Sequence, residues 1–125
     1  MNHVCDGPHC CALAASADPQ MDLLAKLFKG FGDPTRLQLL HLLRQGERNV
    51  RDLVEATGFS QPNISAHLAC LRDCGLVIAR PSGRATYYSI ADERIENLFL
   101  AAEDIVGRIA GRLCNCERYR VSDGR

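Results

Sequence analysis

Several features that would reveal a function directly are absent from this 125-residue sequence. No apolar run reaches the roughly 18 residues of a membrane-spanning helix, and the N-terminus lacks the basic start and apolar segment of a secretion signal. The sequence contains no glycine-rich phosphate loop, no His-x-x-Glu-His motif and no nucleophile–base pattern. We therefore predict a cytoplasmic protein that is not an enzyme, contacts no membrane and takes no small organic substrate.

Net charge is also absent, because 15 basic residues balance 15 acidic ones. The distribution is uneven. Residues 34–90 carry seven arginines and four acidic residues, whereas the segments before and after them are slightly acidic. A locally basic surface is enough to bind phosphates, so nucleic-acid contacts are expected in the middle of the chain.

Cysteine, in contrast, is abundant, with seven residues. An odd number excludes complete internal pairing. In a cytosolic protein, clustered cysteines indicate metal ligands or redox centres rather than structural disulfides. They form three groups: Cys5, Cys10 and Cys11; Cys70 and Cys74; Cys114 and Cys116.

Apolar periodicity, capping residues and glycines predict a mainly α-helical fold with one small β-hairpin. A first helix runs from about residue 19 to residue 30 or 32. Three further helices each begin at a capping residue and end at a glycine: Asp33 to Gly46, Asn49 to Gly58 and Ser60 to Gly75. A short helix, a tight turn and a second helix of this length form a helix-turn-helix.

The pattern changes to that of strands after residue 75. Residues 76–79 and 86–90 are expected to pair through a turn at residues 81–84, and a hairpin directly after a recognition helix is a wing. Asp92 is expected to cap a last helix that weakens near Gly111.

These elements predict a winged helix-turn-helix domain at residues 19–113. A flexible cysteine-bearing arm (residues 1–18) precedes it, and a cysteine-bearing tail (residues 114–125) follows. The first and last helices carry more apolar surface than so small a core needs. We therefore expect a homodimer that forms through these two helices.

The helix after residue 60 distributes its side chains by face. Ile64, Leu68 and Leu71 share a core stripe. The other faces carry polar and small residues suited to the major groove, and the hairpin adds two arginines. The predicted DNA-binding residues are Ser60, Gln61, Asn63, Ser65, Ala66, His67, Arg80 and Arg84.

Cys70 and Cys74 lie four residues apart in this helix, and therefore one turn apart on one flank. Two thiolates placed in this way can hold one soft metal ion, and ligation there can move the helix without competing for the bases. A single cysteine at such a position is more often an ordinary small side chain beside the core. A pair, in a chain with two further clusters, favours a metal site.

The sequence resembles the ArsR/SmtB family of winged-helix metal sensors over about residues 21–109. The motifs that carry this resemblance are FGDPTR at residues 31–36, SQPNISAHL at residues 60–68 and GRATYYS at residues 83–89. The resemblance implies a dimeric repressor that occupies double-stranded operator DNA and leaves it when metal binds.

Sensing sites occur at several places in this family. A Cys-x-Cys-Asp site would fall at residues 49–52, which contain no cysteine, and of the zinc ligands on the last helix only Asp92 is present. The variant found in CmtR-like cadmium and lead sensors is the closest. It implies Cys70 and Cys74 as ligands, with Cys114 or Cys116 as the third.

Thiolates prefer soft and borderline ions, so Cd(II) or Pb(II) is the expected metal ion, with Zn(II) and As(III) as alternatives. We interpret the N-terminal cysteine group as a second metal site, an arm that completes the first metal site, a redox-active tail or a set of incidental thiols. Two other functions stay open: a repressor released by thiol oxidation, and a metal buffer that binds no DNA. Thiols four residues apart on an intact helix are set somewhat too far apart for easy bridging, and the basic hairpin argues against a buffer.

Overall fold

A computed structural model describes residues 18–115, with only the backbone of Leu113 and Cys114. The chain divides into two compact units, residues 1–92 and residues 93–125. Most of the predicted arm and tail lies outside the described residues, and so do Cys5, Cys10, Cys11 and Cys116.

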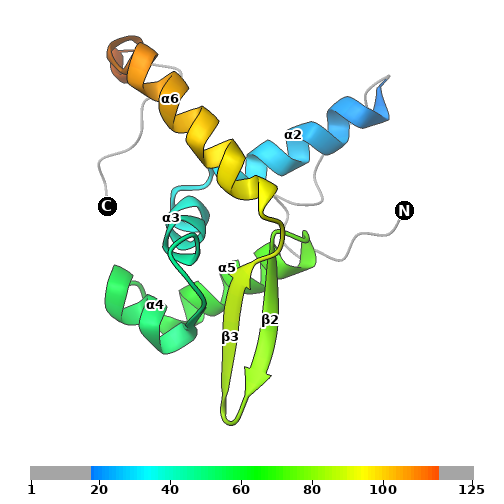
Figure 1. Ribbon diagram of the computed structural model, residues 1–125, viewed down its shortest axis with the longest axis vertical. Helices are drawn as coiled ribbons and strands as arrows, with labels where there is room; N and C mark the ends of the chain where they lie inside the picture. The colour runs from blue at the N-terminus through cyan, green and yellow to red at the C-terminus, as the bar shows by residue number, and fades with distance from the viewer. Residues whose placement is uncertain (1–17, 116–125) are drawn as a thin grey trace. The chain divides into compact units, whose positions relative to one another are not determined.

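Four helices build the first unit: α2 (Pro19–Gly32), α3 (Pro34–Leu43), α4 (Val50–Thr57) and α5 (Gln61–Asp73) (Figure 1). The three predicted N-caps are confirmed. The side chains of Asp33, Asn49 and Ser60 accept hydrogen bonds from backbone N–H groups of the following turn at 3.0, 2.8 and 3.3 Å. Such bonds satisfy amide groups that have no partner inside the helix, and this fixes where each helix begins.

Glycine ends the helix-turn-helix elements as predicted. Gly58 follows α4 with φ +77°, and Gly75 follows α5 with φ +82°. At the end of α5, the N–H of Leu76 donates to the carbonyl of Leu71 at 2.9 Å, and the N–H of Gly75 donates to the carbonyl of Arg72 at 3.0 Å. This is a Schellman motif, and it leaves Cys74 at the C-cap of α5.

The sheet has three antiparallel strands in the order β1-β3-β2: β1 (Arg48–Asn49), β3 (Ala85–Ile90) and β2 (Val77–Ser82). Strands β2 and β3 form the predicted wing, which projects beyond the helices of this unit (Figure 1). The sequence pattern does not predict β1, because a strand of two residues is too short to show a period.

The predicted turn at residues 81–84 is too long. Pro81 and Ser82 lie in β2, and only Gly83 and Arg84 connect the strands. Gly83 has φ +62°, the conformation that a two-residue hairpin of type II′ needs at its first position. Pro81 is tolerated because β2 is an edge strand, where a missing N–H costs no ladder hydrogen bond.

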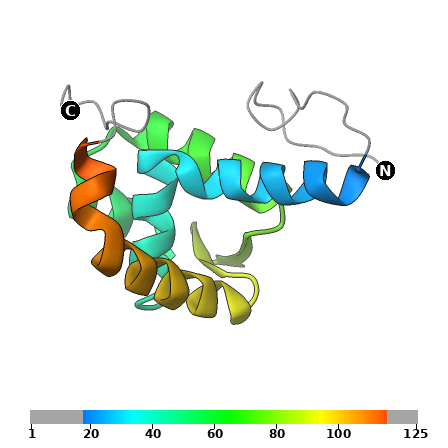
Figure 2. The same cartoon turned by 90° about the horizontal axis from the view of Figure 1, so that it is seen from above.

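The core of the first unit is aliphatic. Leucines of α3 and α4 meet the predicted stripe of α5 and the start of the wing, and burying each side chain contributes about 1.5–3 kcal/mol. These residues are Leu39, Leu40, Leu43, Leu53, Ile64, Leu68, Leu71, Leu76 and Val77. No residue of α2 is buried, and its N-terminal half extends beyond the other helices of this unit (Figure 2).

The second unit contains α6 (Arg94–Asn115), whose Ile95 and Phe99 are buried. This helix begins at Arg94, two residues after the predicted cap Asp92. It extends further than predicted at its other end and continues through Gly111, because one glycine costs a helix only about 1 kcal/mol. The backbone of Cys114 therefore lies in the last turn of α6 rather than in a tail. None of the helices described is long and apolar enough to cross a membrane.

Candidate functional site

The first half of α5 presents the predicted DNA-reading residues at the surface. Gln61, Asn63 and Ala66 are exposed, and Ser65 and His67 are partly exposed. The amide of Gln61 donates a hydrogen bond to the hydroxyl of Ser65 at 2.8 Å, so the two side chains lie together on one face. Proline at the second helical position and the Ser60 cap hold this turn in shape. Exposed polar groups at the start of a recognition helix are the ones that reach base edges.

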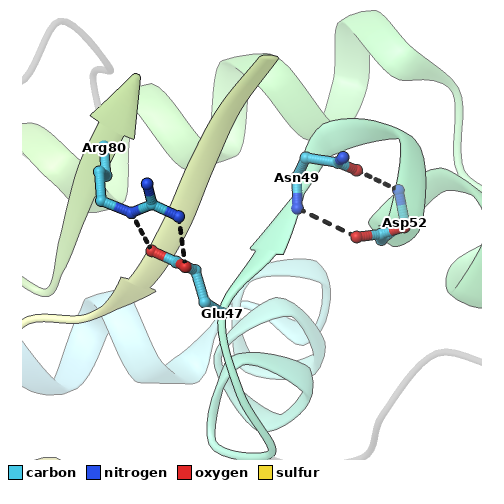
Figure 3. Close-up of polar contacts among 4 residues, drawn as sticks. All are labelled: Glu47, Asn49, Asp52 and Arg80. Atoms are coloured by element: carbon cyan, nitrogen blue, oxygen red, sulfur yellow. Dashed lines mark hydrogen bonds and ion pairs between the residues drawn. The ribbon is translucent and has the colours of Figure 1, made fainter. Parts of the chain in front are cut away.

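The wing arginines differ in their surroundings. Arg84 is exposed in the two-residue turn at the tip. Arg80 donates two hydrogen bonds to the Glu47 carboxylate, at 2.8 and 2.9 Å (Figure 3). Its guanidinium lies 5.3 Å from the centroid of the Tyr87 ring. The hydrogen bond from Arg80 lowers the pKa of Glu47, and the same bond raises the pKa of Arg80. The positive charge of Arg80 is therefore partly neutralised by Glu47, whereas Arg84 is open to a phosphate.

Glu47 is a residue that sequence reasoning misses. It stands 33 residues before its partner and belongs to no motif. Its position depends on β1, which pairs with β3 in the register Asn49↔Tyr87, while Arg80 pairs with Tyr87 from the other side. Figure 3 shows the Glu47 contact close to the capping box in which Asn49 and Asp52 bond reciprocally.

Cys70 and Cys74 are close neighbours on the second half of α5. The Cys74 thiol lies close enough to raise the pKa of Cys70, and neither cysteine forms a disulfide. Cys70 is partly buried, and Cys74 is exposed at the helix end. The predicted arrangement on one flank, one turn apart, is confirmed.

Arg36 is a second residue beside the candidate site that sequence reasoning misses. This residue of α3 is only 5% exposed, and its Nη1 donates a hydrogen bond to Sγ of Cys70 at 3.5 Å. Its Nε lies 3.8 Å from Oδ2 of Asp33, the residue that caps the same helix. The sequence offers two signals for Arg36. It ends the FGDPTR motif, and it is a charged side chain among the leucines of α3, which requires a partner from elsewhere.

Burial raises the pKa of the Cys70 thiol to about 11, and the negative charge of a Cys74 thiolate adds to this effect. The positive charge of Arg36 acts in the opposite direction. The thiol is therefore protonated at neutral pH. A metal ion must displace its proton, and a guanidinium already faces the sulfur atom that would then carry negative charge.

The structure brings together two of the seven predicted metal ligands. Among the residues described, no group of three or more His, Cys, Asp or Glu side chains is arranged to hold a metal ion. Cys114 belongs to the second unit, and only its backbone is described. Two thiols fit a soft ion and form a two-sulfur set, so an ion that prefers three or four sulfur ligands would need a further ligand from outside this pair.

Residues 33–79 match the family model for the bacterial regulatory proteins of the arsR family. The chain is also 42% identical over 97 residues to the "Probable mercury resistance operon repressor" of Streptomyces lividans, and the alignment covers 78% of each protein. The chain belongs to the ArsR family.

Two further comparisons place this ArsR-family protein among regulators. It is 40% identical over 72 residues to the HTH-type transcriptional regulator CmtR of Mycobacterium bovis, covering 58% of this chain and 61% of CmtR. It also matches the homodimeric winged helix-turn-helix DNA-binding domain Mb0332 of Mycobacterium bovis. That match has a TM-score of 0.66 and 33% identity, and it covers 88% of this chain and 99% of the domain.

The family assignment confirms the predicted fold class, a winged helix-turn-helix. The relatives are transcriptional regulators and not enzymes, as predicted. The assignment also bears on the position of the two cysteines of α5. The recognition helix of this ArsR-family protein carries a thiol pair, one or two turns beyond the polar residues that face outwards.

Proposed function

We propose that this protein is a dimeric repressor that binds operator DNA and is released when a thiophilic metal ion binds Cys70 and Cys74. One observation carries this proposal: two neighbouring thiols lie on the recognition helix itself. An ion held there is attached to the element that enters the major groove. Any shift of α5 that improves metal coordination then changes how the helix fits DNA.

DNA contact is proposed through the start of α5 and the tip of the wing. Gln61, Asn63 and Ser65 are suited to base edges, and Ser60, Ala66 and His67 to the groove wall and backbone. Arg84 is suited to a phosphate, and Arg80 becomes available to one if its bond to Glu47 opens.

Dimerisation is supported by apolar side chains that remain exposed in each unit. Many large apolar side chains left exposed on one helix favour an interaction site, and a homodimeric neighbour has the same fold. The exposed residues of α2 are Met21, Leu23, Leu24 and Phe28, and those of α6 are Leu100, Ile105, Val106 and Ile109. A two-fold dimer would place two recognition helices against two half-sites.

The third ligand is proposed to be Cys114 or Cys116, with the N-terminal Cys5, Cys10 and Cys11 as further candidates. Three thiolates suit Cd(II), Pb(II) or As(III), and four suit Zn(II). The mercury repressor among the relatives adds Hg(II), for which two thiolates are a complete set.

The decisive experiment measures operator binding and metal binding on the same samples. Full-length protein in a non-thiol reductant is titrated against labelled DNA from upstream of its own gene, with and without Cd(II). We expect Cd(II) to weaken binding at least tenfold, which corresponds to a coupling free energy of about 1.4 kcal/mol. In Cys70→Ser and Cys74→Ser, DNA binding should persist and metal-driven release should vanish.

Cys114→Ser and Cys116→Ser serve to locate the third ligand. Thiolate-to-metal absorption should fall only in the variant that lacks the cysteine that binds the metal. Normal release in both Cys70→Ser and Cys74→Ser would refute the proposal. Release by an oxidant alone would favour the redox repressor instead. Metal binding without any DNA binding would favour the buffer.

A further inference from the structure

We propose that Arg36 is a specificity-determining residue of the thiol site and that it favours metal–thiolate complexes of net negative charge over neutral ones. This inference rests on the proposed function, since it concerns the ion that Cys70 and Cys74 would hold. Arg36 is not one of the sulfur ligands. It acts on the ligand sphere through a hydrogen bond to one sulfur atom.

The geometry supports a direct effect of Arg36 on the sulfur atom. Its Nη1 lies 3.5 Å from Sγ of Cys70, and the residue is only 5% exposed, so little water separates or screens the two groups. Hydrogen bonds with one ionised partner are about twice as strong as neutral ones. Converting the thiol to a metal-bound thiolate therefore strengthens a contact that already exists.

The charge of the product depends on the ion. A divalent ion that displaces three thiol protons gives a trithiolate of charge −1 and releases three protons. Arsenous acid, As(OH)₃, takes three thiols, loses three waters and gives a neutral trithiolate. A divalent ion with two thiolates is also neutral. Only the first product carries a net negative charge that a neighbouring guanidinium can stabilise.

Other charged groups near the site define what Arg36 adds. Asp73, on the same helix, contributes negative charge at Cys70, and a thiolate at Cys74 contributes more. Asp33 lies on the far side of the guanidinium, with Oδ2 3.8 Å from Nε. Among the residues described, Arg36 is the positively charged residue that acts on Cys70. Its removal would leave an anionic complex, of which the Cys74 thiolate is part, beside the negative charge of Asp73.

The test compares Cd(II) and As(III) affinities of the full-length protein, measured by thiolate absorption in competition with a chelator or a dithiol. We expect Arg36→Gln to weaken Cd(II) binding by about tenfold and As(III) binding by less than about twofold. Arg36→Lys should restore most of the Cd(II) affinity. Arg51→Gln removes an exposed arginine of α4 and should leave the ratio of the two affinities unchanged.

A second variant keeps the test decisive if Arg36→Gln does not fold. Asp33→Asn removes the carboxylate beside the guanidinium, and asparagine still caps the helix. With that negative charge removed, Arg36 should favour Cd(II) over As(III) more strongly. An unchanged ratio in Asp33→Asn, or equal losses of both ions in folded Arg36→Gln, would overturn the inference.

The design separates this inference from the proposed function. If Cys70→Ser binds both ions as wild type does, the thiol site itself is wrong. If binding depends on Cys70 but the ratio does not respond to Arg36 or Asp33, only the role of Arg36 is wrong.

Discussion

Arg80 of the wing strand β2 donates two hydrogen bonds, of 2.8 and 2.9 Å, to the carboxylate of Glu47. Arg80 pairs with Tyr87 of the central strand, and its guanidinium meets the carboxylate of Glu47, the residue just before β1. Figure 3 shows the two hydrogen bonds. A predicted DNA contact is thus already paired with an acidic residue of the same chain. Both side chains face solvent, so DNA phosphates can compete for the arginine.

Glu47→Gln should therefore tighten DNA binding. The change removes one negative charge and frees Arg80 for a phosphate, so we expect affinity at low salt to rise by a few fold, and the slope of log K against log salt to steepen by about one. Anisotropy titrations at several salt concentrations measure both. Asp104→Asn, which removes a carboxylate from an exposed ion pair of α6, is the control and should change neither. Weaker binding by Glu47→Gln would mean that the pair keeps the wing in its binding shape.

Arg84→Ala should weaken operator binding. Arg84 is exposed at the wing tip, and losing one phosphate contact should flatten the salt dependence by about one unit of slope across different DNA sequences. The same titrations provide the measurement, with Arg108→Ala on α6 as the matched control. An unchanged slope would remove the wing tip from the interface.

The two thiols should differ in reactivity with pH. Burial raises the pKa of Cys70 from 9.0 to about 11, whereas Cys74 is exposed at the helix end. Alkylation followed by mass spectrometry should therefore modify Cys74 first at pH 8, and the rate at Cys70 should rise about tenfold per pH unit until pH approaches 11. Equal rates at pH 8 would contradict the buried environment of Cys70.

The same shift has a consequence for stability. The unfolded chain loses the Cys70 proton at lower pH than the folded chain does, so the contribution of the neutral thiol is complete below about pH 9 and declines between pH 9 and 11. Denaturant midpoints of wild type should fall over this interval relative to those of Cys70→Ser. Parallel curves for the two proteins would refute the linkage.

Gly58→Ala should destabilise the helix-turn-helix. Gly58 has φ +77°, and a Cβ there would meet no atom within 4 Å, so the cost is conformational and amounts to about 1–2 kcal/mol. Gly32→Ala is the control, because it has similar free space, lies in α2 and lacks a positive φ. Urea unfolding should show a loss only for Gly58→Ala. A similar loss in both variants would point to packing rather than backbone conformation.

Local features of the fold were predictable from the sequence. Caps such as Asp33 and Ser60, and end glycines such as Gly58 and Gly75, act within a few residues of themselves. The sequence predicts the wing, but the predicted turn begins two residues before the observed one, because Pro81 and Ser82 are typical of turns and only the edge position of β2 accommodates them. The end of α6 was missed because Gly111 suggests a break that the rest of the helix overrides.

The sequence alone determined that two thiols would share one flank of the recognition helix, since four residues make about one helical turn whatever surrounds them. Only the tertiary structure decided what faces those thiols and what holds the wing. Arg36 meets Cys70 across 34 residues, and Glu47 meets Arg80 across 33. Such pairs depend on how helices and strands pack, because a long charged side chain finds its partner in space and leaves no period or spacing along the chain.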